Sequence, residues 1–257
     1  MRNRIMKRSR ANKKRLLMRR ITLLAAVAAL TAAVMIAIKL NVLRQGEKLR
    51  VLSEEEIAAA VSMGKEAEAG INDASTEKRL ALLDAACSIV GEVNYFWGGK
   101  SGATGPDSEW GEIREVTSEG SGSTGTMRPY GLDCSGYITW IFVQLGYSFG
   151  EAEKVVGNGT YKQWHLSKQI AWEDMRIGDI VFKDSYPTKG VNHVGICVGF
   201  LESGEPVYAH CSSTYDNVIV STGGAIFKHP RRTLLLCEEP DAILNRICHI
   251  KNKRLAG

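Results

Sequence analysis

Residues 130–137 read Tyr130-Gly131-Leu132-Asp133-Cys134-Ser135-Gly136-Tyr137 and place one cysteine between a glycine-rich run and a periodic apolar segment. Beyond Tyr137, apolar residues recur with the spacing of one helix face, at Ile138, Ile141, Phe142 and Leu145. Asp133 is a favourable N-cap and Gly146 a favourable stop, so the pattern predicts a helix that begins at Cys134. The free N–H groups and the dipole of a helix start favour an anion, which predicts a lowered pKa for this thiol.

A lone cysteine is more often a small buried hydrophobic residue than a nucleophile. Four stretches, taken in order, favour the nucleophile because they resemble the motifs of the NlpC/P60 family of cysteine peptidases. They are Tyr95-Phe96-Trp97-Gly98-Gly99, Asp133-Cys134-Ser135-Gly136, Gly178-Asp179-Ile180-Val181-Phe182 and His193-Val194-Gly195-Ile196. The resemblance covers Thr76 to Leu236.

The order of the predicted elements is typical of an α+β fold, with helices first and an antiparallel sheet afterwards. Strand-like runs separated by hairpin signals cover residues 179–183, 193–200, 206–210, 218–221 and 232–236. The resemblance implies a papain-like arrangement. In it, two N-terminal helices, one of which starts with the nucleophile, pack on one side of the sheet.

The resemblance also implies roles for six residues. Cys134 would be the nucleophile, His193 the general base and His210 the residue that orients its ring. Tyr95 would donate its hydroxyl to the oxyanion, while Asp133 and Ser135 would hold the amine of the peptide substrate. The simpler alternatives are a helix cap for Asp133 and a neutral, hydrogen-bonded histidine for His193.

The hairpin between the two histidines sets a geometric condition. Direct opposition of His193 and His210 requires a turn centred near Leu201-Glu202, whereas the turn-forming residues Ser203-Gly204 lie slightly later. A bulge or a strand twist is therefore expected to bring the two rings together.

The N-terminus is expected to be a membrane anchor. Residues 1–20 carry ten Lys or Arg and no acid, whereas the rest of the chain carries 23 basic and 28 acidic residues. The following run, Ile21 to Ile38, has no charge, and eighteen helical residues span about 27 Å, close to the ~30 Å hydrocarbon core. We therefore expect a basic cytoplasmic arm over 1–20, a single transmembrane helix over 21–40 and everything beyond it outside the membrane. A cleaved signal peptide is the alternative.

The remaining boundaries follow from composition. Residues 41–75 are charged, rich in Ala and poor in aromatics, and predict a helical stalk or linker. Residues 76–250 are long enough to form a catalytic domain with its own core. Lys100 to Arg128 is an insertion relative to the family, rich in Gly, Ser, Thr and Glu; it is either a disordered surface loop or a lid over the substrate.

The cysteine spacing gives no support for a metal site. The six cysteines contain no Cys-x-x-Cys pair, and His193 and Cys197 would lie about 13 Å apart on a strand, too far to share one ion. Cys237 and Cys248 are free to pair if their Cα atoms lie close enough. We expect neither a metal nor an organic cofactor, and no nucleic-acid partner.

The resemblance implies a membrane-anchored cysteine peptidase of the cell wall that hydrolyses the D-glutamyl–diamino-acid bond of peptidoglycan stem peptides through an acyl-enzyme. Anchored wall hydrolases of this kind often serve secretion or conjugation machinery, which gives a class of partner. Two alternatives remain. One is a thiol amidase or acyltransferase that acts on another substrate, and the other is a non-catalytic wall-binding scaffold of the same fold.

Overall fold

The computed structural model describes residues 18, 22, 49–186 and 192–237 of the 257-residue chain. The chain divides into two compact units, Met1–Glu47 and Lys48–Gly257. Apart from Met18 and Thr22, the expected basic arm and membrane anchor lie outside the described residues, as does Cys248. No helix within the described ranges is both long and apolar enough to cross a bilayer.

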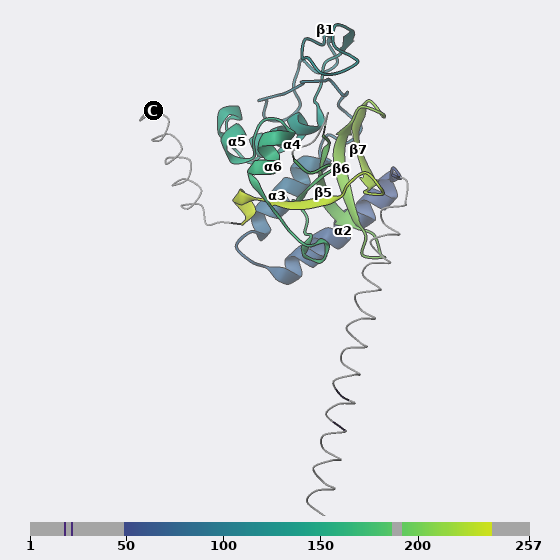
Figure 1. Cartoon of the computed structure of the whole chain (residues 1–257), viewed down its shortest axis with the longest axis vertical. Helices are drawn as coiled ribbons and strands as arrows, with labels where there is room; N and C mark the ends of the chain where they lie inside the picture. The colour runs from purple at the N-terminus through teal and green to yellow at the C-terminus, as the bar shows by residue number, and fades with distance from the viewer. Residues whose placement is uncertain (1–17, 19–21, 23–48, 187–191, 238–257) are drawn as a thin grey trace, which may run out of the picture. The chain divides into compact units, whose positions relative to one another are not determined.

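A six-stranded antiparallel sheet forms the centre of the second unit (Figure 1). In spatial order its strands are β3 (Ser167–Gln169), β8 (His229–Thr233), β4 (Ile180–Phe182), β5 (Val194–Phe200), β6 (Pro206–Ser212) and β7 (Asn217–Thr222). The expected α+β class with an antiparallel sheet is confirmed.

The last predicted strand, over 232–236, is wrong in its position. Strand β8 ends at Thr233, and Leu234–Leu236 forms a short 3-10 helix that buries Leu235 and Leu236. Strand β8 contains the polar pair Arg231 and Arg232, and these guanidiniums are satisfied by neighbouring carbonyl oxygens and a buried carboxylate. Because this strand lacks the alternation of apolar and polar residues that is typical of strands, its position could not be predicted from the sequence pattern.

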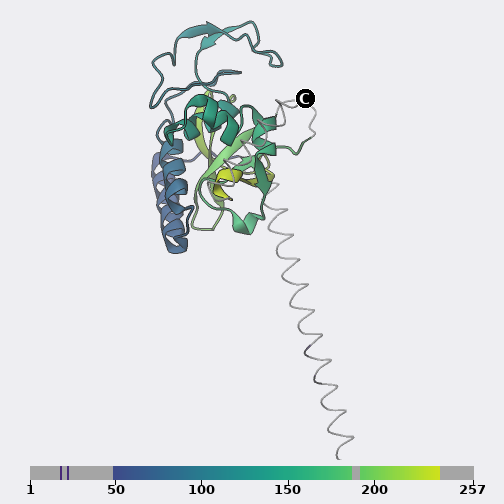
Figure 2. The ribbon, with the colours of Figure 1, turned by 90° about the vertical axis from the view of Figure 1, so that its left-hand side faces the viewer.

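Three helices contribute to the core on one face of this sheet: α2 (Glu54–Ile71), α3 (Thr76–Cys87) and α4 (Cys134–Gln144). Helix α2 begins with a capping box between Ser53 and Glu56, and α2 and α3 run side by side (Figure 2). Two shorter helices, α5 (Phe149–Val155) and α6 (Thr160–His165), follow α4, and the 3-10 helix Trp172–Asp174 precedes β4.

The expected stalk over 41–75 needs a correction, because its helix α2 packs against β5. Ala60 is 1% exposed, and a Cβ added at Gly199 of β5 would lie only 2.1 Å from the Ala60 carbonyl oxygen. A Cβ added at Gly64, on the next turn of α2, would lie 3.0 Å from the Cα of Gly199. Small residues thus let the two backbones touch, and α2 is part of the folded unit rather than a free spacer.

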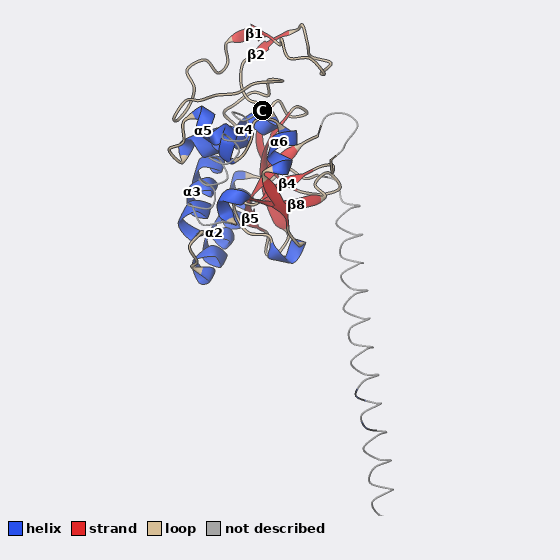
Figure 3. Cartoon of the chain, turned by 60° about the vertical axis from the view of Figure 1, so that its left-hand side comes forward, coloured by secondary structure: helices blue, strands red, loops and turns tan. Residues whose placement is uncertain are grey.

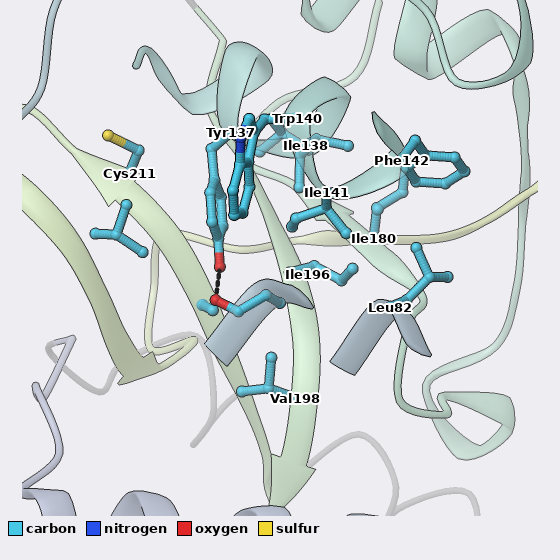
Figure 4. Packing of buried hydrophobic residues seen from close by; sticks show 14 of the residues in the cluster. Leu82, Tyr137, Ile138, Trp140, Ile141, Phe142, Ile180, Ile196, Val198 and Cys211 are labelled. Carbon is cyan, nitrogen blue, oxygen red and sulfur yellow. Dashed lines mark hydrogen bonds between the residues drawn. The ribbon is translucent and has the colours of Figure 1, made fainter. Parts of the chain in front are cut away.

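Helix α4 is the centre of the core, and every side chain from Cys134 to Val143 is buried. Ile138 and Ile141 lie near Ile180 and Ile196 of the sheet (Figure 4). The hydroxyl of Tyr137 donates a hydrogen bond of 2.6 Å to the carbonyl oxygen of Ala86 in α3. A helix that is apolar on all sides is buried on all sides, which holds its first residue in a fixed place.

The insertion at 100–128 carries a two-stranded ribbon, β1 (Ile113–Glu115) and β2 (Met127–Pro129), at one end of the domain (Figure 3). Trp110 packs on Trp140 of α4 with ring centroids 5.7 Å apart, and Val116 is 1% exposed. The insertion therefore contributes its own apolar contacts to the folded unit.

A buried ion cluster ties the helices to the sheet. Arg79 of α3 and Asp179, just before β4, are fully buried and lie 3.0 Å apart. Arg232 of β8 also binds Asp179, at 2.8 Å, and Arg176 binds the buried Glu68 of α2. The Gly-Asp motif before β4 thus supplies a structural carboxylate.

We predict that Asp179→Ala lowers the free energy of unfolding by about 3–5 kcal/mol, because it removes the hydrogen-bonded carboxylate of the buried Arg79 and leaves only Glu68, at 4.0 Å. The matched control is Asp84→Ala, which breaks the exposed pair with Lys65 and should cost less than about 1 kcal/mol. Chemical denaturation measures both values. Equal effects of the two substitutions would contradict a structural role for the cluster.

Candidate active site

The first turn of α4 presents Cys134 as expected from the sequence. Asp133 is the N-cap, and its carboxylate accepts the N–H of Gly136 at 2.6 Å. Helix α4 ends at Gln144, and Gly146 follows with a φ of 92°. Cys134 is only 4% exposed, so its sulfur lies deep in the site rather than on an open surface.

Two glycines bring the segment 95–99 directly against this helix start. A Cβ at Gly136 would lie 2.1 Å from the carbonyl oxygen of Gly99, and one at Gly99 would lie 2.2 Å from the carbonyl oxygen of Gly131. The N–H of Asp133 donates to the Gly99 carbonyl at 3.2 Å. Because no side chain fits between these backbones, the Gly-Gly motif is a packing requirement of the site.

The structure brings His193 and His210 into direct contact. Nε2 of His193 lies 2.9 Å from Nδ1 of His210, and Nε2 of His210 lies 2.9 Å from the hydroxyl of Ser221 in β7. Phe227 stacks on the His193 ring at 5.5 Å between centroids. These contacts fix both rings, as a general base with an orienting partner requires. Nothing in the sequence singles out Ser221, which is placed by the pairing of β6 with β7.

A β-bulge determines that the two histidines share a face. The register of β5 on β6 changes by one residue between Cys197 and Gly199. Towards the start of β5, this register places Ser212 opposite His193, and His210 then lies two residues away on the same face. Without the extra residue, His210 would point to the other side of the sheet. The bulge expected from the turn position is therefore confirmed.

Cys134 contacts the residues on both sides of His193. Its Sγ lies 4.0 Å from the carbonyl oxygen of Asn192, and the N–H of Val194 lowers its pKa by hydrogen bonding. The Asn192 side chain is itself fixed, because it exchanges two hydrogen bonds with the backbone of Asp184 at 2.7 and 2.9 Å. The helix start and the strand start thus meet at the candidate nucleophile.

Burial controls the acid–base properties of this pair. It raises the pKa of Cys134 to about 12, and the charge of Asp133 adds to the increase, whereas the Val194 N–H and Lys100 oppose it. Burial also lowers the pKa of His193 to about 4, with a further decrease from Lys183. The expectation of a lowered thiol pKa is wrong for the free site, because desolvation of the sulfur outweighs the helix start. At pH 7 the thiol and the imidazole are both neutral.

Lys100 was missed from the sequence, although its ammonium is held by the residues on both sides of Cys134. Its Nζ lies 2.7 Å from each carboxylate oxygen of Asp133 and 2.9 Å from the hydroxyl of Ser135. These contacts use all three of its N–H donors. The resemblance implies that Asp133 and Ser135 bind the amine of the substrate. In this structure they bind the ammonium of Lys100 instead. The sequence signal was a cation directly after Gly98-Gly99.

Tyr95 lies beside the same helix start, since its backbone forms an isolated bridge with Leu132. Burial raises the pKa of its phenol, and Cys134 and Asp133 raise it further, so the hydroxyl stays protonated. This hydroxyl has no hydrogen-bond partner among the residues that the structure describes, which leaves it available as a donor. All six residues singled out from the sequence therefore come together in one region.

Residues 92–229, more than half of the chain, match the model of the NlpC/P60 family. Over 122 residues the chain is 27% identical to the peptidoglycan DL-endopeptidase CwlO of Bacillus licheniformis, a match that covers 46% of this chain and 20% of that protein. The chain thus matches about a fifth of the length of this curated relative.

Two solved structures from Mycobacterium tuberculosis are similar to the fold. One is the peptidoglycan hydrolase RipB, at 19% identity and a TM-score of 0.41, covering 69% of this chain and 82% of that chain. The other is RipD, described as a non-catalytic NlpC/p60 domain protein adapted to peptidoglycan binding. It is 15% identical with a TM-score of 0.39, covering 60% of this chain and 95% of that chain.

We predict that Lys100→Met raises the pKa of Cys134, because the substitution removes a cation that stabilises the thiolate. The alkylation rate of Cys134 at a fixed pH of 9 should fall tenfold for each unit by which the pKa rises. Loss of the ionic hydrogen bonds should also reduce the free energy of unfolding by about 1–3 kcal/mol.

The control is Lys154→Met, which removes an exposed lysine from α5 and should change neither quantity. Peptide mapping by mass spectrometry after timed iodoacetamide labelling follows Cys134 separately from the other thiols. An unchanged alkylation rate in Lys100→Met would show that the ammonium does not influence the thiol.

Proposed function

Because this chain belongs to the NlpC/P60 family of peptidoglycan hydrolases, we propose that it cleaves stem peptides with Cys134 as the nucleophile. The observation that supports this most strongly is the 2.9 Å contact between His193 and His210, in a strand start whose Asn192 and Val194 both contact Cys134. A nucleophile, a base and a residue that orients the base are the groups that acyl transfer requires. The bond proposed for cleavage joins D-glutamate to the diamino acid.

In the first half of the reaction, Sγ of Cys134 attacks the carbonyl carbon while His193 takes the thiol proton. Since both groups are neutral at rest, the thiolate forms during the attack, when the peptide covers the site. The carbonyl oxygen becomes an oxyanion that the Cys134 N–H and the Tyr95 hydroxyl stabilise. The C–N bond then breaks, His193 protonates the leaving amine, and a thioester remains on Cys134.

In the second half, His193 takes a proton from water as the water oxygen attacks the thioester carbonyl. The C–S bond breaks, the sulfur regains a proton from His193, and the glutamyl product leaves as a carboxylic acid that loses its proton to the solvent. His210 holds the His193 ring in the orientation that serves both halves, and Ser221 holds His210.

A non-catalytic wall-binding role is the second candidate. The observation in its favour is the burial of Cys134, which raises the pKa of the thiol to about 12 and limits access to the sulfur. The two candidates differ in a single outcome, namely whether a peptide bound at the site is cleaved.

We also propose that residues 21–40 anchor the protein in the membrane, with residues 1–20 in the cytoplasm and the catalytic domain outside the cell. The support is the basic, then uncharged, pattern of the N-terminus. An extracytoplasmic domain is on the same side as peptidoglycan, and an anchored wall hydrolase fits a role beside secretion or conjugation machinery.

We predict that the full chain cleaves purified muropeptides and that Cys134→Ala abolishes this cleavage. His193→Ala should lower kcat/KM by about 10²–10⁴-fold, and His210→Ala by less, because water can partly replace an orienting group. Cys237→Ala, which removes an exposed thiol, should leave the rate unchanged. Mass spectrometry of the products gives both the rate and the bond cleaved. Hydrolysis by Cys134→Ala would exclude the mechanism.

We predict that protease added to wall-free cells digests the region after Asn41 and spares the basic arm, because the bilayer protects only the N-terminal side. Immunoblots against each end of the chain measure the fragments. Full protection of the domain, or a mature protein that begins near Leu40, would refute the proposed anchor.

A further inference from the structure

A pocket of about 430 Å³ lies between the insertion and the segment that carries Tyr95. Tyr95 and Trp97 line it from that segment, and Val116 and Arg128 line it from the insertion. Asp216, in the turn between β6 and β7, completes its rim. The pocket adjoins the candidate active site, because Tyr95 forms a backbone bridge with Leu132, two residues before Cys134, and the N–H of Phe96 donates to the Leu132 carbonyl at 3.0 Å.

The walls of this pocket are held in place by specific contacts. The indole N–H of Trp97 donates to the carbonyl oxygen of Glu119 at 2.9 Å. Gly98 adopts a φ of 81°, and a Cβ there would lie 2.0 Å from the hydroxyl oxygen of Ser118. The insertion thus packs directly on the Gly-Gly segment, so the pocket is a feature of this chain's departure from the family pattern.

Arg128 is the basic side chain of the pocket, and it forms no ion pair with any residue that the structure describes. Across the ribbon it pairs directly with Arg114, an unfavourable arrangement for two like charges. Arg114 is neutralised by Glu109 and Glu112, at 3.1 and 2.6 Å. Among the described residues, Arg128 makes only one weak hydrogen bond, from Nε to the Thr126 hydroxyl at 3.4 Å. A bound anion would supply the partner that the guanidinium of Arg128 lacks.

The acidic residue of the pocket does not fill that role. The two carboxylate oxygens of Asp216 accept the backbone N–H of Tyr95 at 3.1 Å and the side-chain amide of Asn94 at 3.2 Å. No ion pair joins Asp216 to Arg128 within the described residues. Asp216 therefore fixes the rim of the pocket, and Arg128 keeps its guanidinium free for a ligand.

We propose that this pocket is a subsite for the free carboxylate of a peptide bound beside Cys134, and that Arg128 pairs with that carboxylate. A guanidinium binds a planar carboxylate through two parallel hydrogen bonds, whereas a carboxamide offers one acceptor and no charge. The protein therefore selects stem peptides with a free α-carboxylate over amidated ones. The identity of the peptide rests on the proposed function, but its binding does not require cleavage.

The test uses the full chain with Cys134→Ala, so that no turnover occurs, and two synthetic stem peptides. They are identical except that one carries a free α-carboxylate on its glutamyl residue and the other a carboxamide. Calorimetry should give a Kd about tenfold or more lower for the carboxylate peptide. Adding Arg128→Gln should remove the difference, while Arg50→Gln, at an exposed arginine paired with Glu56, should preserve it.

Equal affinity for the two peptides, or binding of neither, would overturn the subsite. If the Arg128→Gln protein still binds the carboxylate peptide more tightly than the carboxamide peptide, the subsite is also overturned, because another group then binds the carboxylate. If the preference is present and depends on Arg128 but the native chain cleaves neither peptide, the subsite stands and the proposed hydrolase activity fails.

Discussion

The extra residue in β5, between Cys197 and Gly199, is the constraint on which the site depends. A strand alternates its side chains between two faces, so one added residue decides that His193 and His210 lie on the same face. The bulge also ends at Gly199, where the absence of a Cβ lets the Ala60 carbonyl of α2 approach the strand. The packing of α2 and the contact between the histidines therefore have a common origin in one strand.

Burial is the second influence on the site, and it acts against the ionised forms of its groups. It raises the pKa of Cys134 and lowers that of His193, so the free site holds a neutral pair. Two buried carboxylates of the domain are each paired with a cation: Lys100 binds Asp133, and Arg79 binds Asp179. A buried site of this kind strengthens the electrostatic contacts that a bound peptide makes.

Local sequence signals predicted the elements that depend on local chemistry. Asp133 and the apolar period after it predicted the start of α4, and the strand-like runs separated by hairpin signals predicted β5 to β7 within a few residues. The features that were missed depend on contacts between distant residues. Lys100 reaches Asp133 across 33 positions, and Arg232 of β8 binds Asp179 across 53 positions. The prediction of a lowered pKa for the Cys134 thiol was wrong for the same reason, because the burial that raises this pKa arises only when the fold is complete.

The central claim is that Cys134 and His193 act together on a peptide carbonyl, and the acyl-enzyme tests it most directly. The full chain is mixed with a defined stem peptide, quenched in acid within milliseconds to seconds and mapped by mass spectrometry. The account predicts the glutamyl fragment as a thioester on Cys134 alone, and none in the His193→Ala protein on the same timescale. Turnover with the glutamyl fragment attached to another residue would contradict the account. Turnover by a protein whose Cys134 has been blocked by alkylation, with no acyl-enzyme detected, would also contradict it.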